Sequence, residues 1–395
     1  MNATDTRLNS NVWLLFFCQA LVNAAGISQV AISALIGHSL AEDKTLATLP
    51  FALQQFGQMA ASIPAGIVFA RLGRKTGFML GAVAMLLGTI LMFWGVLIAN
   101  FPIFCIGAVP VGIGFGIGQH YRFAASEVAP PALRPRAIAL VMAGGVISAI
   151  LGPEIVKHTK DVMGPILFLG TYIALAVLPL ISMVLIWLVK LPPAPPRAVS
   201  PTPLAQIIRR PGFITAVIAG LVGYGTMNLI MAATPLEMML CGYGVDASTD
   251  VIRAHALAMF APGFFTGRLI QRFGVHNIIV IGGVLCIGCA GMALLAPVFL
   301  NFMVALAILG LGWNFMFVGA TTLLATAHEP AERVRAQAAN DFIVFTTVTL
   351  TAFTSGALHT SMGWAWVNLS VVPFVIVAMG LVLWHRIAVA RAVPA

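Results

Sequence analysis

Two pairs of residues with soft donor atoms stand close together in the second half of the chain. The stretch "MNLIM" places Met227 and Met231 four positions apart, and "HALAM" places His255 and Met259 at the same spacing. Residues four apart lie on one face of a helix, so each pair could present two ligands to one ion. Thioether sulfurs and a neutral imidazole suit Cu(I) or Ag(I) better than Zn(II), Mg(II) or Ca(II). Methionine also fills gaps in packed cores, so packing remains the alternative from spacing alone.

The composition indicates which elements must position these side chains. Of the 395 residues, 60% are hydrophobic and only 8% are charged, and the mean hydropathy is +1.00. We therefore predict an integral membrane protein of the all-α class with about twelve spanning helices. Barrel strands are excluded because the apolar runs do not alternate. The predicted spans are 12–35, 45–70, 77–97, 101–125, 137–157, 164–189, 212–240, 252–270, 277–297, 301–325, 337–359 and 364–386.

The basic residues predict the orientation of these spans. They crowd alternate loops, as in Arg71, Arg74 and Lys75, and again in Arg333 and Arg335. By the positive-inside rule these loops and both termini are cytoplasmic. The opposite loops contain few basic residues, namely Lys44, Lys157, Lys160 and Arg253. Topology thus accounts for the net charge of +9, and nucleic-acid binding is not needed to explain it.

The chain also divides into two similar halves. A proline-rich stretch from Lys190 to Gly212 predicts an N-terminal six-helix bundle at 1–190, a cytoplasmic linker at 191–211 and a C-terminal six-helix bundle at 212–395. The segments "GIVFARLGRK" and "GRLIQRFGVH" share Gly66/Gly267, Arg71/Arg272 and Gly73/Gly274 at one constant offset. "PALRPRA" and "PAERVRA" form a second match. Two repeated six-helix halves predict a transporter with its substrate site between the halves.

The loop after the second span resembles the signature G-x-x-x-D-R-x-G-R-K/R of the major facilitator superfamily. In register are Gly66, Arg71, Gly73, Arg74 and Lys75, but Ala70 stands where the acidic residue is expected. The stretch "SAILGP" in the fifth span is similar to a glycine-proline motif of the same superfamily. The resemblance implies the major facilitator fold and a multi-pass protein of the bacterial inner membrane.

The soft pairs, followed by "APGFFTGRLIQRFG", resemble those of the CcoA-type copper importers. This resemblance implies that Met227, Met231, His255 and Met259 bind copper, as Cu(I), during import by alternating access. The copper would supply assembly of haem-copper oxidases through a cytoplasmic copper acceptor. The same resemblance implies that the protein is a monomer in the lipid bilayer, that copper is its substrate and that it has no cofactor.

A small-organic-molecule carrier is the alternative, with either riboflavin-like uptake or proton-coupled drug efflux. Relatives of the copper importers that lack the soft pairs resemble riboflavin transporters. The alternative therefore predicts that transport does not depend on any of the four side chains of these pairs. No Walker motif and no nucleophile with a supporting base is found in the sequence. An enzyme is therefore not expected.

Several other polar or reactive residues fall in or beside the predicted spans. At the outer end of the seventh span, Cys241 could capture Cu(I) or serve as a small apolar filler, and Glu237 could attract a cation or take a proton. Arg122 could snorkel to the cytoplasmic surface or, with Gln119 and His120, line an inner exit. Glu154 and Asp341 could form gating ion pairs. Buried glutamines could form a hydrated wall in the N-terminal half or bridge helices; with Asn23 they are Gln19, Gln54, Gln55 and Gln58. Packing is preferred for Cys286 and Cys289 and for the glycine-rich run from Gly112 to Gly118.

Overall fold

A computed structural model of the chain describes residues 9–130, 133–191, 202–329 and 332–392. The described residues form helices, turns and loops without a β-strand, which confirms the all-α class. Ten helices among them are long and apolar enough to cross a membrane. Parts of the predicted 191–211 linker and of the "PALRPRA" and "PAERVRA" match lie outside the described residues.

The other two predicted spans are also helical, but one is less apolar than the ten helices above and the other is divided into two short helices. The 45–70 span is α2 (Leu49–Leu72), where three glutamines lower the hydropathy. The 252–270 span consists of α10 (Val245–Phe260) and α11 (Gly263–Phe273), which are separated at Ala261 and Pro262. Proline has no N–H to donate to the carbonyl four residues earlier, so the helix is interrupted at Pro262.

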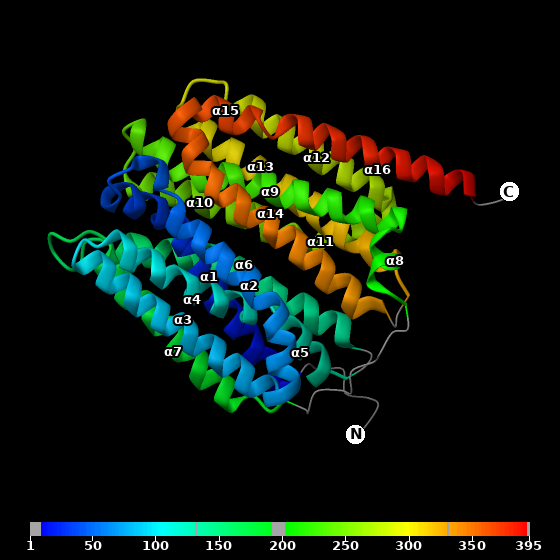
Figure 1. The fold of residues 1–395 in the computed structure, drawn as a ribbon, viewed down its shortest axis with the longest axis horizontal. Helices are drawn as coiled ribbons and strands as arrows, with labels where there is room; N and C mark the ends of the chain where they lie inside the picture. The colour runs from blue at the N-terminus through cyan, green and yellow to red at the C-terminus, as the bar shows by residue number, and fades with distance from the viewer. Residues whose placement is uncertain (1–8, 131–132, 192–201, 330–331, 393–395) are drawn as a thin grey trace. The chain divides into compact units, whose positions relative to one another are not determined.

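One compact unit comprises Met1–Pro195 together with Gly244–Arg253. In this unit α3 and α4 pack side by side, and α1 lies against α6 (Figure 1). Its elements are α1 (Ser10–Leu40), η1 (Lys44–Leu46), α2 (Leu49–Leu72), α3 (Arg74–Leu97), α4 (Phe101–Gly118), α5 (Tyr121–Val128), α6 (Arg134–Thr159), α7 (Leu169–Leu188) and the first part of α10.

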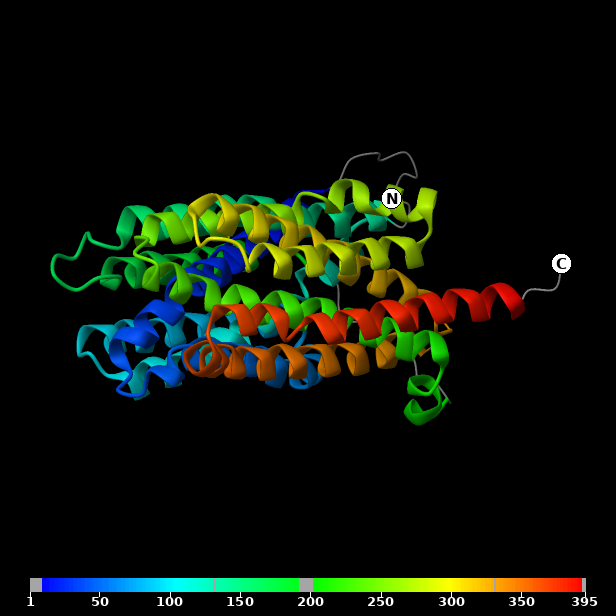
Figure 2. The ribbon, with the colours of Figure 1, turned by 90° about the horizontal axis from the view of Figure 1, so that it is seen from above.

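The second compact unit comprises Pro196–Tyr243 and Ala254–Ala395. Here α9 packs against α13 and α14, while α16 runs beside α12 and α9 (Figure 2). Its elements are α8 (Leu204–Ile208), α9 (Pro211–Leu240), the rest of α10, α11 (Gly263–Phe273), α12 (Val275–Met292), α13 (Phe299–Thr326), α14 (Arg333–Met362), α15 (Trp364–Leu369) and α16 (Val372–Ala392).

The repeat seen in the sequence recurs in the backbone of the two units. Gly73 joins α2 to α3 with a φ of 80°, and Gly274 joins α11 to α12 with a φ of 85°. L-residues with a side chain rarely adopt this conformation, which explains a glycine at both turns. The shared glycines therefore mark equivalent corners of two similarly built units.

Glycines also allow the helices of each unit to approach closely. A Cβ on Gly114 of α4 would lie 2.4 Å from the Gly81 carbonyl oxygen of α3. A Cβ on Gly312 of α13 would lie 2.9 Å from the Gly282 carbonyl oxygen of α12. The prediction that the run from Gly112 to Gly118 serves helix packing is thus confirmed.

Candidate functional site

His255 lies at the centre of the candidate site in the C-terminal unit. Its side chain is fully buried, and Nδ1 lies 2.7 Å from the backbone carbonyl oxygen of Leu306 on α13. A carbonyl only accepts, so Nδ1 carries the proton and Nε2 of the neutral ring has a lone pair. Nε2 is buried without a hydrogen-bond partner among the described residues. A backbone carbonyl on one nitrogen and a free lone pair on the other is the arrangement found in metal-ligating histidines.

Helix α13 fixes the position of α10 and of the break that follows it. A Cβ on Gly310 would lie only 2.5 Å from the His255 carbonyl oxygen, so glycine permits this contact. Asn314 donates from Nδ2 to the Met259 carbonyl at 2.7 Å and accepts from the Thr266 hydroxyl at 2.6 Å. The side chain of Asn314 therefore satisfies a backbone carbonyl beside the interruption at Pro262.

The two methionines of the other pair lie on α9. Both Met227 and Met231 are buried, as is Met259. Neighbouring Asn228 donates to the Val348 carbonyl of α14 at 3.0 Å, which fixes the rotation of α9. Both pairs thus belong to helices that pack on α13. The hydrogen bonds of the described residues join neither methionine of α9 to the imidazole of His255.

A second polar cluster lies near the ends of α9 and α14. Glu237 Oε2 lies within hydrogen-bond distance of His359 Nε2, at 2.6 Å, and the Cys241 sulfur lies 3.5 Å from Glu237 Oε1. Burial and the neighbouring carboxylate raise the pKa of Cys241 above its usual value, which disfavours a thiolate. Across the described residues, no group of three His, Cys, Asp or Glu side chains could hold a metal ion.

Buried amides gather in the N-terminal unit. Gln19 donates to Asn23 at 3.0 Å, and Gln119 donates to the same oxygen at 3.4 Å, so these amides bridge α1 to the end of α4. Gln54 and Gln58 of α2 differ, because the Oε1 atom of each is buried without a hydrogen-bond partner in the described part of the chain. Such orphaned acceptors are uncommon in folded proteins and call for an explanation.

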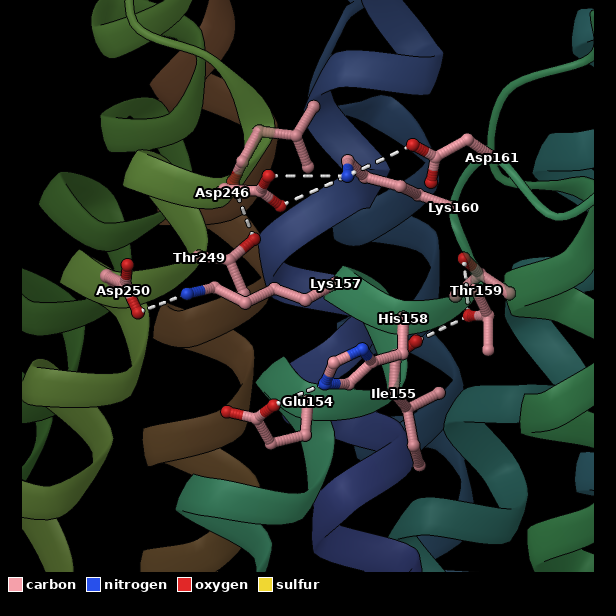
Figure 3. Close-up of polar contacts among 12 residues, drawn as sticks. Glu154, Ile155, Lys157, His158, Thr159, Lys160, Asp161, Asp246, Thr249 and Asp250 are labelled. Atoms are coloured by element: carbon pink, nitrogen blue, oxygen red, sulfur yellow. Dashed lines mark hydrogen bonds and ion pairs between the residues drawn. The ribbon is translucent and has the colours of Figure 1, made fainter.

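An ion-pair ladder joins α6 to the first part of α10 within the N-terminal unit (Figure 3). Lys157 lies 2.5 Å from Asp250, and Lys160 lies 3.2 Å from Asp246. Glu154 pairs with Arg253. We name these three links the outer ladder; it supplies the partner that sequence alone did not reveal for Glu154.

The remaining predicted residues have local partners. His120 lies 3.2 Å from the Gly116 carbonyl, and the guanidinium of Arg122 stacks over Phe123 at 4.8 Å. Asp341 accepts from Asn340 at 3.0 Å. The buried thiols of Cys286 and Cys289 are not bridged. Cys286 donates to the Met316 sulfur of α13 at 3.9 Å, which agrees with the packing interpretation.

Sequence reasoning missed two residues that shape these sites. His359 is separated from Glu237 by most of the C-terminal half, and neither spacing nor composition joins them. Asn314 was not singled out either, although an amide inside an apolar run is a recognisable signal. For Gln54 and Gln58 the sequence does contain a signal, because the offset that relates Gly66 to Gly267 also relates these two glutamines to His255 and Met259.

Comparison with known proteins adds two kinds of similarity. The family model described as Major Facilitator Superfamily matches residues 12–342 and 251–394. The chain is 38% identical over 374 residues to "Riboflavin transporter RfnT" of Brucella anthropi, with 94% of each chain covered. It is 24% identical over 392 residues to "Uncharacterized MFS-type transporter YddS" of Bacillus subtilis, covering 94% of this chain and 90% of the relative.

Two solved structures share the fold at low sequence identity. A D-xylose–proton symporter aligns with a TM-score of 0.74 and 14% identity, covering 94% of this chain and 96% of the other. A bacterial homologue of the human lysosomal transporter Spinster, solved inward-facing and occupied, aligns with a TM-score of 0.71 and 14% identity, covering 94% and 95%.

Proposed function

Because this chain belongs to the Major Facilitator Superfamily, we propose that it imports a small organic molecule of the flavin class by alternating access. It is a secondary transporter of the bacterial inner membrane and not an enzyme. The observation that carries the flavin proposal is the 38% identity to a riboflavin transporter along 94% of both chains. Identity at this level over the whole length favours a related substrate class over an unrelated one.

Buried polar groups inside apolar helices give the proposal its physical basis. An unpaired polar atom within a membrane protein is costly and is a functional-site hypothesis by default. The described residues contain such atoms at Gln54, Gln58 and His255. A flavin has imide, hydroxyl and ring-nitrogen groups that can supply both donors and acceptors to these positions.

Copper import is the second candidate, and a specific observation favours it. The Nε2 lone pair of His255 is buried and unpartnered within the described residues, four positions before Met259. With Met227 and Met231 these side chains would form a neutral soft donor set for Cu(I). Neutral ligands leave a bound Cu(I) with a single charge, which limits the cost of carrying it through the bilayer. In this scheme the ion passes to a cytoplasmic copper acceptor.

One paired uptake experiment separates the two candidates. Bacteria expressing the wild-type chain are supplied with radiolabelled riboflavin or radiolabelled copper, alongside cells that carry an empty vector. The flavin proposal predicts saturable riboflavin uptake above the level of the vector, removed by excess unlabelled riboflavin. Copper accumulation should remain at the vector level.

The variant Met231→Leu adds the decisive comparison, because leucine preserves volume and removes the thioether. Riboflavin uptake should persist in this variant. Copper uptake by the wild type that disappears in Met231→Leu and in His255→Leu, with equal amounts of protein in the membrane, would instead establish the second candidate.

A further inference from the structure

The N-terminal unit contains a polar pair at the position that His255 and Met259 occupy in the C-terminal unit. The same offset that aligns the two glycine-arginine loops aligns Gln54 with His255 and Gln58 with Met259. Both pairs have a spacing of four residues and lie upstream of the repeated loop, on α2 in one unit and on α10 in the other, where the short helix α11 follows before the loop. The sequence repeat therefore relates two pairs of buried polar or soft side chains.

The backbone packing around the first member of each pair is the same. A Cβ on Gly112 of α4 would lie 1.9 Å from the Gln54 carbonyl oxygen. A Cβ on Gly310 of α13 would lie 2.5 Å from the His255 carbonyl oxygen. In each unit a glycine of the equivalent helix thus approaches the backbone of the equivalent residue, which fixes where its side chain begins.

The correspondence extends one helical turn further. Gly116 of α4 would place a Cβ 2.9 Å from the Gln58 carbonyl oxygen, and Asn314 of α13 donates to the Met259 carbonyl at 2.7 Å. Gly116 and Asn314 each lie four residues after the glycine that contacts the first pair member. The two sites are therefore built by equivalent helix pairs, α2 with α4 in one unit and α10 with α13 in the other.

The side chains at these positions also share unused hydrogen-bonding capacity. Gln54 and Gln58 are each 2% exposed, and the Oε1 atom of each lacks a hydrogen-bond partner among the described residues, as does Nε2 of His255. Helix packing alone does not account for a polar atom in this condition, because a buried acceptor without a partner costs free energy. A ligand with donor groups would supply the missing partners.

We propose that Gln54 and Gln58 form a substrate site in the N-terminal unit, where their amide oxygens accept hydrogen bonds from N–H or O–H groups of the substrate. This inference rests on the proposed flavin transport and specifies which chain groups recognise the substrate. Amide oxygens are hard ligands that serve soft Cu(I) poorly. The imide N–H and the hydroxyl-bearing side chain of a flavin provide donors of the required kind.

The test uses the purified full-length chain in lipid vesicles, with riboflavin as the probe and binding followed by the change in its fluorescence. Gln54→Leu and Gln58→Leu should each raise the Kd about tenfold, as expected for loss of a buried hydrogen bond. The matched control is Gln55→Leu on the same helix, because Gln55 already has an interaction within the protein. Its Kd should change less than about twofold.

Ligand analogues separate substrate recognition from a structural role. Riboflavin methylated at the imide nitrogen and lumiflavin, which lacks the hydroxyl-bearing chain, each remove one type of donor. The wild type should discriminate against at least one analogue, and the corresponding leucine variant should lose that discrimination. Gln54→Met and Gln58→Met preserve the unbranched shape without the acceptor and replace any leucine variant that does not fold.

The outcomes distinguish the inference from the function on which it rests. Riboflavin transport by the wild type combined with unchanged affinity and unchanged discrimination in both glutamine variants overturns this inference alone. A folded wild-type chain that neither binds nor carries riboflavin overturns the proposed function and, with it, the donor-bearing ligand class assigned to the two glutamines.

Discussion

One hydrogen bond determines which nitrogen of His255 can interact with a substrate or ion. Because Nδ1 donates to the Leu306 carbonyl, we expect the neutral ring to be protonated at Nδ1 and unprotonated at Nε2. Solid-state nitrogen NMR of histidine-labelled protein in lipid would detect this tautomer directly. The His255→Gln variant identifies the signal by its disappearance, and a ring protonated at Nε2 would contradict the arrangement.

A second residue-scale prediction concerns Glu332, at the start of α14. Its carboxylate is 1% exposed and accepts two hydrogen bonds from Arg210, at 2.6 and 2.9 Å. Hydrogen bonds from Arg210 hold the pKa of Glu332 down, to about 2. A carboxyl with a lowered pKa stabilises the fold above its ordinary pKa, and this contribution disappears as the pH falls toward 2.

Glu332→Gln should therefore lower the melting temperature by several degrees at pH 7, and the difference from wild type should shrink as the pH falls from about 4.5 toward 2. Thermal unfolding in detergent at a series of pH values measures both effects. Glu42→Gln serves as the control because that side chain is exposed and belongs to the other unit. An equal loss in both variants would show that the Arg210 pair is not the cause.

At the scale of elements, glycine contacts between helices predict where a methyl group is not tolerated. Gly112→Ala would place Cβ 1.9 Å from a backbone oxygen of α2, and Gly66→Ala would meet nothing within 4 Å. We expect Gly112→Ala to lower the melting temperature and the yield of folded protein. Gly66→Ala should be neutral or slightly stabilising, since alanine favours a helix by about 1 kcal/mol over glycine.

Fluorescence-detected size-exclusion chromatography after heating would compare the two alanine variants. Similar melting temperatures would mean that α2 and α4 can separate without loss of stability. Gly310→Ala provides an independent repetition in the C-terminal unit, where its Cβ would lie 2.5 Å from the His255 carbonyl oxygen.

The outer ladder predicts a salt-sensitive attachment of the first part of α10 to α6. Burial lowers the pKa of Lys160, but hydrogen bonds and charges of Asp246 and Asp161 outweigh it and raise the pKa above its ordinary value. A lysine with a raised pKa keeps its stabilising charge below its ordinary pKa and loses it only in strong alkali. The ladder should therefore respond to ionic strength more than to pH in the neutral range.

Charge reversal tests the middle link of the ladder. Lys157→Glu places a carboxylate beside Asp250, and we expect hydrogen exchange in residues 245–253 to accelerate several-fold. The double variant Lys157→Glu, Asp250→Lys should recover much of the protection because the pair is restored with opposite polarity. Exchange that is equally slow in all three proteins would rule out a role for this pair in holding α10.

The elements were more predictable from sequence than the contacts among them. Hydropathy located the spans because the bilayer requires long apolar helices, and the repeat located the equivalent glycine corners. The same patterns could not find the contact of Glu237 with His359, since a side-chain hydrogen bond between segments far apart in the sequence leaves no local signal. They also could not show that Gln54 and Gln58 have unpartnered oxygens while Gln19 is bonded to Asn23.

For the whole molecule, the distribution of charge predicts an orientation in the membrane. Basic residues cluster at one set of loops, as at Arg71 and Lys75 or Arg209 and Arg210, and the other loops contain few. The positive-inside rule places the clustered loops and both termini in the cytoplasm. The outer ladder would then lie on the periplasmic side, because the turn after α6 belongs to the opposite set.

Reporter insertions into the full-length chain test this orientation. Alkaline phosphatase, which is active only in the periplasm, should be active when inserted after Lys44 or Asp161 and inactive after Lys75. Green fluorescent protein, which fluoresces in the cytoplasm, should fluoresce at the C-terminus. Replacing Arg71, Arg74 and Lys75 by glutamine is the matched perturbation, since it removes positive charge without adding bulk. If the charge bias sets the orientation, this variant should show a mixed reporter pattern; phosphatase activity after Lys75 in the unaltered chain would reverse the assignment.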